Sequence, residues 1–248
     1  MMRFDLVTIF PDFFRGPLDY GVVARAARSG TIAVAVHDLR GWAEGPHRIT
    51  DDRPFGGGEG MVMKPEPIAA CLDTLAGGAA RPHASGVWVV LLSAQGRRFD
   101  QAAARRLAAY DRLILLCGRY EGVDERVAEY MADEELAVGD FVLSGGELAA
   151  AMVLDAVARL QPGVLGDAQS ARNESFPESA ADGSATAPGA PLLDCPHYTR
   201  PAEFRGWGTP EVLRGGDHAA IARWRREAAG EKTRRNRPDL LAGERPGG

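Results

Sequence analysis

The sequence has few cysteines and no long apolar run. Its three cysteines, Cys71, Cys117 and Cys195, are far apart and match neither a disulfide framework nor zinc spacing. The five histidines include no HExxH or other ligand pair, so no metal site is expected. No stretch approaches the roughly 20 apolar residues of a membrane span. Residues 1–14 also lack the layout of a signal peptide. We therefore expect a cytoplasmic protein without membrane contact.

Common nucleotide-binding and hydrolase motifs are absent as well. There is no GxxxxGK[ST], which argues against a P-loop. The first strand-like run leads into Phe10-Pro11-Asp12 and no GxGxxG, which argues against an ordinary dinucleotide site or a methyltransferase with that first loop. There is no GxSxG elbow of a serine hydrolase.

The chain is acidic overall but contains one basic region. Its 248 residues carry a formal net charge of −5, with ordinary contents of 45% hydrophobic and 25% charged residues. Seven basic residues and only two acidic ones lie between Arg223 and Arg237. This region is either a solvated helix face or a surface for a polyanion such as nucleic acid.

The first two thirds of the chain alternate strand-like and helix-like segments. Apolar strand runs with helical crossovers predict an α/β fold, with a mostly parallel sheet covered on both faces. The strand-like runs are residues 4–10, 32–37, 87–93 and 113–117, and the helix-like segments are residues 21–28, 66–75 and 101–110.

A longer helix is predicted over residues 145–161, before Pro162-Gly163. Ser144 and Glu147 have the spacing of a capping box at its start. One face of this helix carries an apolar stripe, made of Leu148, Met152, Ala156 and Leu160.

The composition divides the chain into three parts: a first domain of residues 1–165, a linker of residues 166–191 and a small helical domain of residues 192–248. The linker is rich in alanine, serine, glycine and proline, which cannot bury enough surface to offset the entropy of ordering. In the last part, a helix over 218–229 is expected, with Asp217 as N-cap and Gly230 as its end. Its predicted buried stripe is Ile221, Trp224 and Ala228.

Three glycine-bearing loops are candidate ligand sites. Residues 118–122 follow a buried strand run, and residues 138–146 lead into the long helix. Loops at the carboxyl ends of parallel strands bind ligands with free backbone N–H groups, so these two predict a small-molecule pocket. The third loop, residues 51–60, has four glycines in its last five residues. It is either a mobile surface loop or a phosphate contact to which Arg53 adds charge.

Four motifs in the same order resemble one family, the bacterial tRNA (guanine-N1)-methyltransferases, or TrmD family, of the SPOUT superfamily. They are DDRPFGGG at 51–58, CGRYEG at 117–122, GDFVLSGGEL at 139–148 and CPHYTRP at 195–201. The resemblance covers the chain from end to end, apart from a longer linker. It implies S-adenosylmethionine as methyl donor and guanosine 37 of tRNA as acceptor. It also implies a SPOUT-type parallel sheet with a deep trefoil knot, and a homodimer whose active site is built from both subunits.

The resemblance also assigns binding residues. The implied tRNA contacts come from the first, second and last motifs. They are Asp51, Arg53, Gly57, Gly58, Arg119, His197 and Arg200. The implied donor pocket consists of Leu91, Leu92, Ser93, Gln95, Gly118, Tyr120, Glu121, Val138, Gly139, Asp140, Phe141, Val142, Leu143, Gly145 and Gly146.

Methylation of guanine N1 requires a base for the N1 proton and a cation for the charge that develops on O6. The family arginine matches Arg159, whose alternative role is an ion pair with Asp155. The family aspartate before Ser-Phe is replaced here by Glu174, which keeps the carboxylate but is one methylene longer. Glu174 is the candidate base; the other interpretations are a solvated linker acid, or Asp182 as the base. Mg²⁺ could assist, but no acidic cluster requires it.

Two rival functions follow from the same residues. A related knotted methyltransferase could act on another RNA atom, such as a ribose hydroxyl. A non-catalytic RNA-binding protein could have kept the fold, which the change at Glu174 motivates. A third rival, a nucleotide-sensing regulator, has only the glycine loops behind it.

Overall fold

The computed structural model describes residues 1–166, 174–177 and 193–241. Its internal contacts divide the chain into two units, Met1–Gly166 and Asp167–Gly248. Of the expected linker, only Gly166 and residues 174–177 lie within the described part, and Asp182 lies outside it. No helix in the described part is both long and apolar enough to cross a membrane.

A five-stranded parallel sheet forms the centre of the first unit, as the sequence predicts. Its strand order is β2-β1-β6-β5-β7. The strands are β1 (Met2–Thr8), β2 (Ile32–Asp38), β5 (Val87–Arg98), β6 (Arg112–Cys117) and β7 (Glu134–Ala137). No strand was predicted at β7, which has only four residues and pairs with β5.

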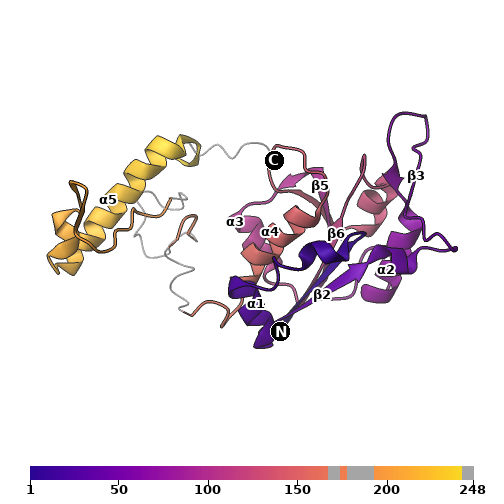
Figure 1. Ribbon diagram of the computed structural model, residues 1–248, viewed down its shortest axis with the longest axis horizontal. Helices are drawn as coiled ribbons and strands as arrows, with labels where there is room; N and C mark the ends of the chain where they lie inside the picture. The colour runs from indigo at the N-terminus through magenta and orange to yellow at the C-terminus, as the bar shows by residue number, and fades with distance from the viewer. Residues whose placement is uncertain (167–173, 178–192, 242–248) are drawn as a thin grey trace. The chain divides into compact units, whose positions relative to one another are not determined.

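Helices cover both faces of this sheet, and a separate hydrophobic cluster fills each interface. Figure 1 shows α1, α3 and α4 together on one side of the sheet and α2 on the other. The first group comprises α1 (Gly21–Arg28), α3 (Gln101–Leu107), α4 (Glu147–Ala158) and the 3₁₀ turn η1 (Pro11–Phe14). The second comprises α2 (Pro65–Leu75), the 3₁₀ turn η2 (Leu39–Trp42) and the π-helical turn η3 (Val127–Met131).

Alternation along the strands assigns side chains to the two clusters. In β1, Phe4 and Leu6 belong to the cluster under α4, whereas Val7 belongs to the cluster under α2. Each such side chain contributes roughly 1.5–3 kcal/mol when fully buried. The apolar strands are therefore covered on both faces, which is why they read as continuous hydrophobic runs.

Asp5 is the charged exception within β1. Its fully buried carboxylate accepts hydrogen bonds from Arg3 Nε at 2.9 Å and Arg112 Nε at 2.7 Å, and lies 2.6 Å from His37 Nε2. Burial alone would raise the pKa of Asp5, but the hydrogen bonds with His37, Arg3 and Arg112 outweigh it and lower that pKa. These contacts join β1 to both of its neighbours, β2 and β6.

The predicted capping box of α4 is wrong. The N-cap is Gly146, no side chain caps the helix, and the Glu147 carboxylate is buried with other partners. The predicted stripe packs on the sheet only in part: Ala156 and Leu160 are partly buried against the core, whereas Leu148 and Met152 remain 51% and 50% exposed. The helix buries its neighbouring face, formed by Ala149, Ala150, Val153, Leu154, Val157 and Ala158.

The described residues of the second unit form one long helix and a short hairpin. The helix α5 runs from His218 to Asn236, with the hairpin strands β8 (Glu203–Phe204) and β9 (Trp207–Gly208) before it. The Asp217 N-cap is confirmed, because its carboxylate accepts from the Ala219 and Ala220 amides. Two short 3₁₀ turns, η4 (Glu211–Arg214) and η5 (Pro238–Leu240), flank the helix.

The predicted end of α5 at Gly230 is wrong. Gly230 is buried inside the helix, next to buried Ala229 and Thr233. Thr233 Oγ1 donates to the Ala229 carbonyl and accepts from the Leu193 amide at 3.0 Å. A Cβ at Gly230 would meet Arg234 Nη1 at an ordinary contact distance of 3.6 Å, and the helix continues through this glycine to Asn236. The predicted stripe is only half-buried at Ile221, Trp224 and Ala228.

Candidate active site

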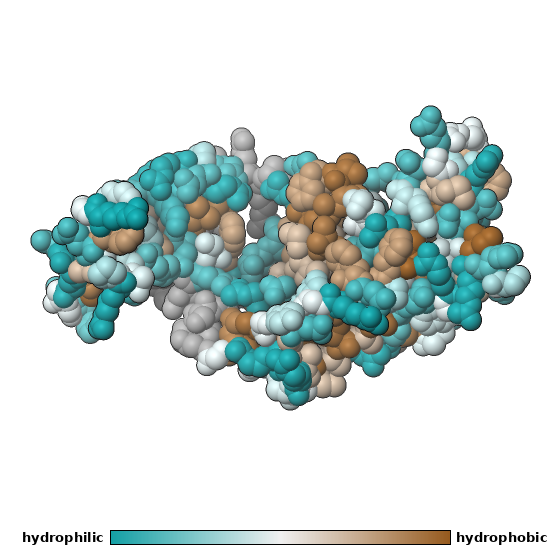
Figure 2. Space-filling view, in the orientation of Figure 1, coloured by the Kyte–Doolittle hydropathy of each residue, from teal (hydrophilic) through white to brown (hydrophobic). Residues whose placement is uncertain are grey.

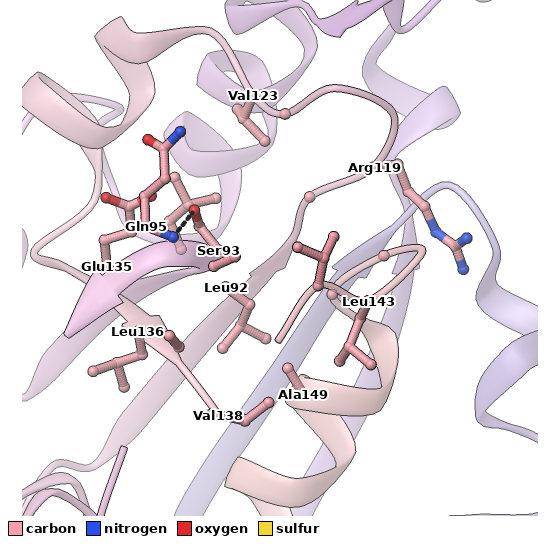
Figure 3. Close-up of a pocket in the computed structure, with 18 of the residues that line it drawn as sticks. Leu92, Ser93, Gln95, Arg119, Val123, Glu135, Leu136, Val138, Leu143 and Ala149 are labelled. Carbon is pink, nitrogen blue, oxygen red and sulfur yellow. Dashed lines mark hydrogen bonds between the residues drawn. The ribbon is translucent and has the colours of Figure 1, made fainter. Parts of the chain in front are cut away.

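A pocket opens in the first unit beside the irregular stretch of β5 and the segments that follow β6 and β7 (Figure 3). It is lined by residues from three parts of the chain: 91–95, 118–123 and 135–146, with Glu125, Ala128 and Ala149 completing the wall. The carboxyl ends of parallel strands meet at this edge, so the backbone there is available to a ligand.

The pocket wall has an apolar part and a polar part. In Figure 3, Leu92, Leu136, Val138, Leu143 and Ala149 surround one part of the hollow, and the polar side chains gather on another. The polar residues there are Ser93, Gln95 and Glu135, with Ser93 Oγ accepting from the Gln95 amide at 3.1 Å. Such a wall suits a ligand that has a flat apolar ring and a polar remainder.

The residues predicted to bind the methyl donor lie around this pocket, with one exception. All of them line it except Asp140, whose side chain is 90% exposed and lies 3.9 Å from Arg98. Sequence reasoning missed Glu135 and Leu136, which belong to β7, and Ala149, which lies in the first turn of α4. The short apolar run at 136–138 was the only available signal for β7.

Two of the pocket loops contact each other directly. The Gly146 amide donates to the Gly118 carbonyl at 2.8 Å, and Arg119 and Gly145 form an isolated antiparallel bridge. A Cβ at Gly146 would lie 2.8 Å from the Cys117 Cα, which is backbone and cannot swing aside. Glycine at this position therefore sets how closely α4 approaches the end of β6.

A buried ion pair, Arg119–Glu147, also joins these loops. Arg119 Nε donates to Glu147 Oε1 at 3.1 Å, and Arg119 Nη2 lies 2.9 Å from Glu147 Oε2. Glu147 Oε1 also accepts from the Thr8 hydroxyl at 2.7 Å, and Arg119 Nη1 donates to the Ser144 carbonyl at 3.0 Å. The pair thus ties the end of β1, the loop after β6 and the start of α4 together.

Arg119 was predicted to contact tRNA, but its guanidinium is held largely within the protein. Its guanidinium carbon lies 4.7 Å from the centre of the Phe10 ring, in a cation–π contact. In Figure 3 the side chain points away from the hollow, and it is only 19% exposed. The geometry therefore gives Arg119 a role in shaping the pocket.

The glycine loop of residues 51–60 connects two short antiparallel strands, β3 (Asp51–Asp52) and β4 (Val62–Met63). Gly57 and Gly58 have φ angles of +80° and +123°, which other residues rarely adopt. Figure 1 shows this loop projecting beyond β3, and Phe55 within it is 99% exposed. Asp51, Arg53, Gly57 and Gly58, all predicted tRNA contacts, therefore lie on one projecting element.

The base of this loop joins the pocket. The Met63 amide donates to the Gly122 carbonyl at 2.9 Å, and the Glu121 amide donates to the Met61 carbonyl at 3.0 Å. Tyr120, which has a φ of +62°, lies close to Asp51. Partial burial, together with the charge of Asp51 and a hydrogen bond to it, raises the pKa of the Tyr120 hydroxyl. The predicted donor loop and the predicted tRNA loop are therefore neighbours.

The two predicted catalytic residues lie in different units. Arg159 is the C-cap of α4, whereas the pocket lies at the N-terminal end of the same helix. Glu174 lies in the second unit, in the short described segment 174–177. The next residue, Ser175, accepts a hydrogen bond from the Asp194 amide at 3.0 Å, which links this segment to the last motif.

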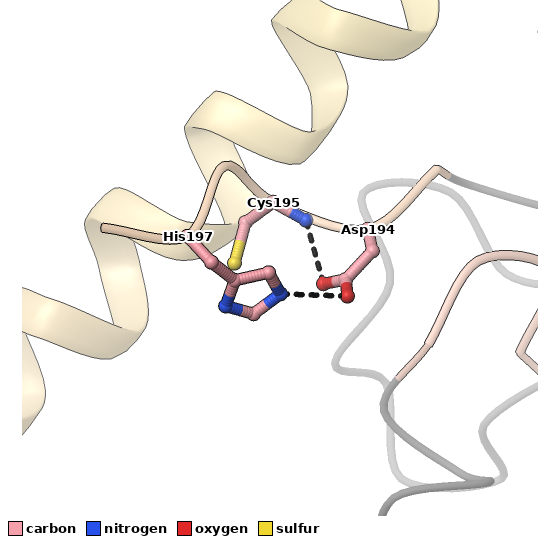
Figure 4. A group of neighbouring side chains, drawn as sticks. All are labelled: Asp194, Cys195 and His197. Carbon is pink, nitrogen blue, oxygen red and sulfur yellow. Dashed lines mark hydrogen bonds and ion pairs between the residues drawn. The ribbon is translucent and has the colours of Figure 1, made fainter. Parts of the chain in front are cut away.

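Immediately before that motif, Asp194 holds His197 in place (Figure 4). One carboxylate oxygen of Asp194 accepts from the Cys195 amide at 2.7 Å, and the other lies 2.8 Å from His197 Nε2. Burial would raise the pKa of Asp194, but the hydrogen bonds with His197 and the Cys195 amide outweigh it and lower that pKa. The predicted tRNA contact His197 is thus oriented by a carboxylate, and Arg200 follows on an exposed stretch.

Asp194, Cys195 and His197 form the only group of metal-type donors found close together in the described part of the chain. Their ligand atoms lie within 4.8 Å of one another. Mg²⁺ prefers oxygen ligands, and this group offers a single carboxylate that already accepts two hydrogen bonds. The group therefore does not fit Mg²⁺.

Fold and pocket together define an α/β protein with a ligand site at the carboxyl edge of a parallel sheet. The family model described as tRNA (Guanine-1)-methyltransferase TrmD matches residues 2–243. A tRNA (guanine-N(1)-)-methyltransferase of Koribacter versatilis (strain Ellin345) is 57% identical over 246 residues, which are 98% of this chain and 93% of the relative. One of Geobacter sulfurreducens (strain ATCC 51573 / DSM 12127 / PCA) is 52% identical over 240 residues, 97% of this chain and 91% of that relative. The chain belongs to the TrmD family of methyltransferase enzymes.

Proposed function

We propose that this enzyme transfers a methyl group from S-adenosylmethionine to N1 of guanosine 37 in tRNA. The observation that carries the proposal is the pocket, because nearly every residue that the family resemblance assigns to the donor lines it. The apolar part around Leu92, Leu136 and Leu143 suits an adenine ring, and backbone groups of the two glycine loops suit its polar atoms. The donor, when bound there, supplies an electrophilic methyl group on a sulfonium.

In the proposed reaction, Glu174 acts as the general base. Its carboxylate takes the N1 proton of the guanine, and negative charge develops on O6 until N1 bonds to the methyl group and the sulfonium departs as a neutral thioether. Arg159 stabilises that charge with its guanidinium. Glu174 and His197 both belong to the second unit and are linked through Ser175 and Asp194, so this unit brings the base and a tRNA contact together.

The position of Arg159 supports an active site that is shared between two copies of the chain. Gly146 and Arg159 cap opposite ends of α4, and 13 residues of helix at 1.5 Å each separate them by about 20 Å. Arg159 is therefore too far along its own helix to reach the methyl group in its own pocket. In a homodimer, Arg159 of one protomer lies at the pocket of its partner.

An exposed apolar surface supports the dimer. Leu148 and Met152 on α4 are about half exposed, together with Phe141 at 54% and Val142 at 87%. Figure 2 shows apolar surface over the region of α4 in this face of the first unit. Exposed patches of this kind mark interfaces in soluble proteins. We assign the exposed part of this apolar stripe, Leu148 and Met152, to the partner.

The trefoil knot belongs to the same proposal. The loops 118–122 and 138–146 that build the pocket also contact each other, through Gly118 and Gly146. We assign the threading of the chain to this part of the first unit, before α4.

The small helical second unit binds the tRNA. Its described residues 193–241 contain ten arginines and lysines and seven acids, in a chain that is acidic overall. If these arginines contact phosphates, the logarithm of the tRNA affinity falls linearly with the logarithm of the salt concentration. The cytoplasm, where tRNA is modified, is the matching location.

The Glu174 assignment is tested by single-turnover methylation of unmodified tRNA over a range of pH. Glu174→Gln removes the base and is expected to slow methyl transfer by about 10²–10⁴-fold. Glu174→Asp restores the family residue and keeps the carboxylate, so substantial activity is expected to remain. Unchanged rates for Glu174→Gln at every pH would remove this residue from the mechanism.

A further inference from the structure

The hairpin of the second unit presents two large aromatic side chains to solvent. Phe204 is 55% exposed and Trp207 is 69% exposed. The two residues are cross-strand partners, with ring centroids 6.0 Å apart and an angle of 54° between the ring planes. Cross-strand partners project from the same face of a hairpin, so the two rings form one exposed surface.

The backbone of this hairpin fixes the surface in place. Arg205 and Gly206 form its two-residue loop and have φ angles of +53° and +80°. Two positive φ angles are the signature of a tight turn whose twist matches its strands. The hairpin is closed by a hydrogen bond from the Thr209 amide to the Ala202 carbonyl at 2.8 Å. The aromatic surface is therefore presented by a defined turn.

Positive charge accompanies the two rings. The guanidinium carbon of Arg205 lies 5.2 Å from the centre of the Phe204 ring. Arginine combined with exposed aromatic rings is the chemistry that binds unpaired nucleotides, since the rings stack on bases and the cation attracts phosphate. The surplus of basic residues in the described part of this unit favours the same kind of partner.

We infer that Trp207, supported by Phe204, is a stacking platform for an unpaired base of the tRNA, with Arg205 directed to the backbone beside that base. The inference rests on the proposed tRNA substrate and adds a contact outside the pocket and the motifs discussed above. An unpaired base can offer its flat face to a tryptophan, whereas a base in a paired stem is already covered by its neighbours.

The test measures the affinity of the full-length protein for two RNAs: an anticodon stem-loop and a fully paired duplex with the same number of phosphates. Trp207→Ala is expected to weaken binding of the stem-loop by roughly 5- to 100-fold, the range found for the loss of one stacked base. Trp207→Phe keeps an aromatic face and should stay within about threefold of the wild type. Binding of the duplex should be equal for all three proteins.

Tyr20→Ala is the matched control, because Tyr20 is a 78% exposed aromatic residue of the first unit. The salt dependence of Trp207→Ala should equal that of the wild type, since no phosphate contact is removed. Normal stem-loop affinity of Trp207→Ala would overturn the platform alone. Loss of affinity together with conversion to monomers in light scattering would also overturn it, because the hairpin would then belong to a contact between copies. Failure of the wild-type protein to bind either RNA would instead overturn the proposed function, and the platform with it.

Discussion

At the scale of single residues, Glu147 has a different role in the structure from the one that the sequence predicts. The sequence predicts a helix cap, and the structure shows a carboxylate that is 1% exposed and paired with Arg119. Both residues adjoin the glycines that bring the pocket loops together. The pair therefore fixes the spacing of the two loops proposed to hold the methyl donor.

Glu147→Gln keeps the shape of this side chain but removes its charge. Removing one partner of a buried pair is expected to lower the free energy of unfolding by about 3 kcal/mol. Donor affinity should fall by about tenfold, because the loops lose their fixed spacing. Calorimetric titration with S-adenosylmethionine checks this, with Glu44→Gln on an exposed surface as control. Lower stability with unchanged donor affinity would reduce the pair to a purely structural role.

Residue by residue, the motifs located the pocket wall well, because glycine loops after strands have few other uses. They do not show which partner a side chain takes where two are open to it, and the tRNA contact of Arg119 stays a prediction. Arg119 looks like a cation for phosphate, and only the fold reveals the buried Glu147 that holds it. Asp194, which orients His197, carries no sequence signal beyond its place next to the last motif.

At the scale of elements, the contact between α4 and the end of β6 depends on Gly146. Its φ of −77° is accessible to alanine, so space alone is the constraint. Gly146→Ala should force α4 away from Cys117, with a stability loss of about 1–3 kcal/mol and markedly weaker donor binding. Gly41→Ala, where an added Cβ would meet open space, is the control. Wild-type donor affinity in Gly146→Ala would show that this contact does not shape the pocket.

The Asp5 cluster makes the sheet sensitive to acid. The pKa of Asp5 is lower in the folded protein than in the unfolded chain, where it is about 4. Ionised Asp5 therefore contributes its full stabilisation above about pH 4. This contribution is lost as the pH falls toward the pKa of Asp5 in the folded protein. Asp5→Asn should destabilise the protein by about 3 kcal/mol at pH 7, and this difference from the wild type should shrink below pH 4. Urea unfolding at pH 7 and pH 3 measures it. An equal difference at both values would contradict the assigned titration.

Long apolar strands and amphipathic helices could be predicted because their pattern of apolar residues extends over many residues. The strand β7 was not, since four residues are too few to show alternation. The end of α5 was mispredicted at Gly230 because a glycine inside a helix looks the same in sequence as one that ends it. In α5 the helix continues past this glycine to Asn236, and the contact with the segment at Leu193 is made by Thr233.

At the scale of the whole molecule, a shared active site predicts complementation between two inactive variants. Arg159→Ala removes the proposed cation, and Gly146→Val blocks the pocket. When the two are unfolded and refolded together, half of the dimers are mixed, and each mixed dimer has one intact site. The mixture should therefore recover about a quarter of wild-type methylation. Each variant refolded alone is the control, and no recovery would contradict the shared site.

The fold class and the family could be predicted from the sequence, because four separate motifs occur in the same order as in the TrmD family. The homodimer was predicted only from the family resemblance, because the apolar stripe of α4 fits a core or an interface equally well. Leu148 and Met152 are about half exposed in the folded chain, which is compatible with the proposed interface.

The central claim, methyl transfer to guanine N1, is tested most directly by mass analysis of nucleosides. An unmodified tRNA transcript with guanosines at positions 36 and 37 is incubated with the wild-type protein and isotopically labelled S-adenosylmethionine, then digested. We predict that the label appears as 1-methylguanosine and that a transcript with another base at position 37 gives none. Label on a ribose or on a different base, or no label although the donor binds, would contradict the account.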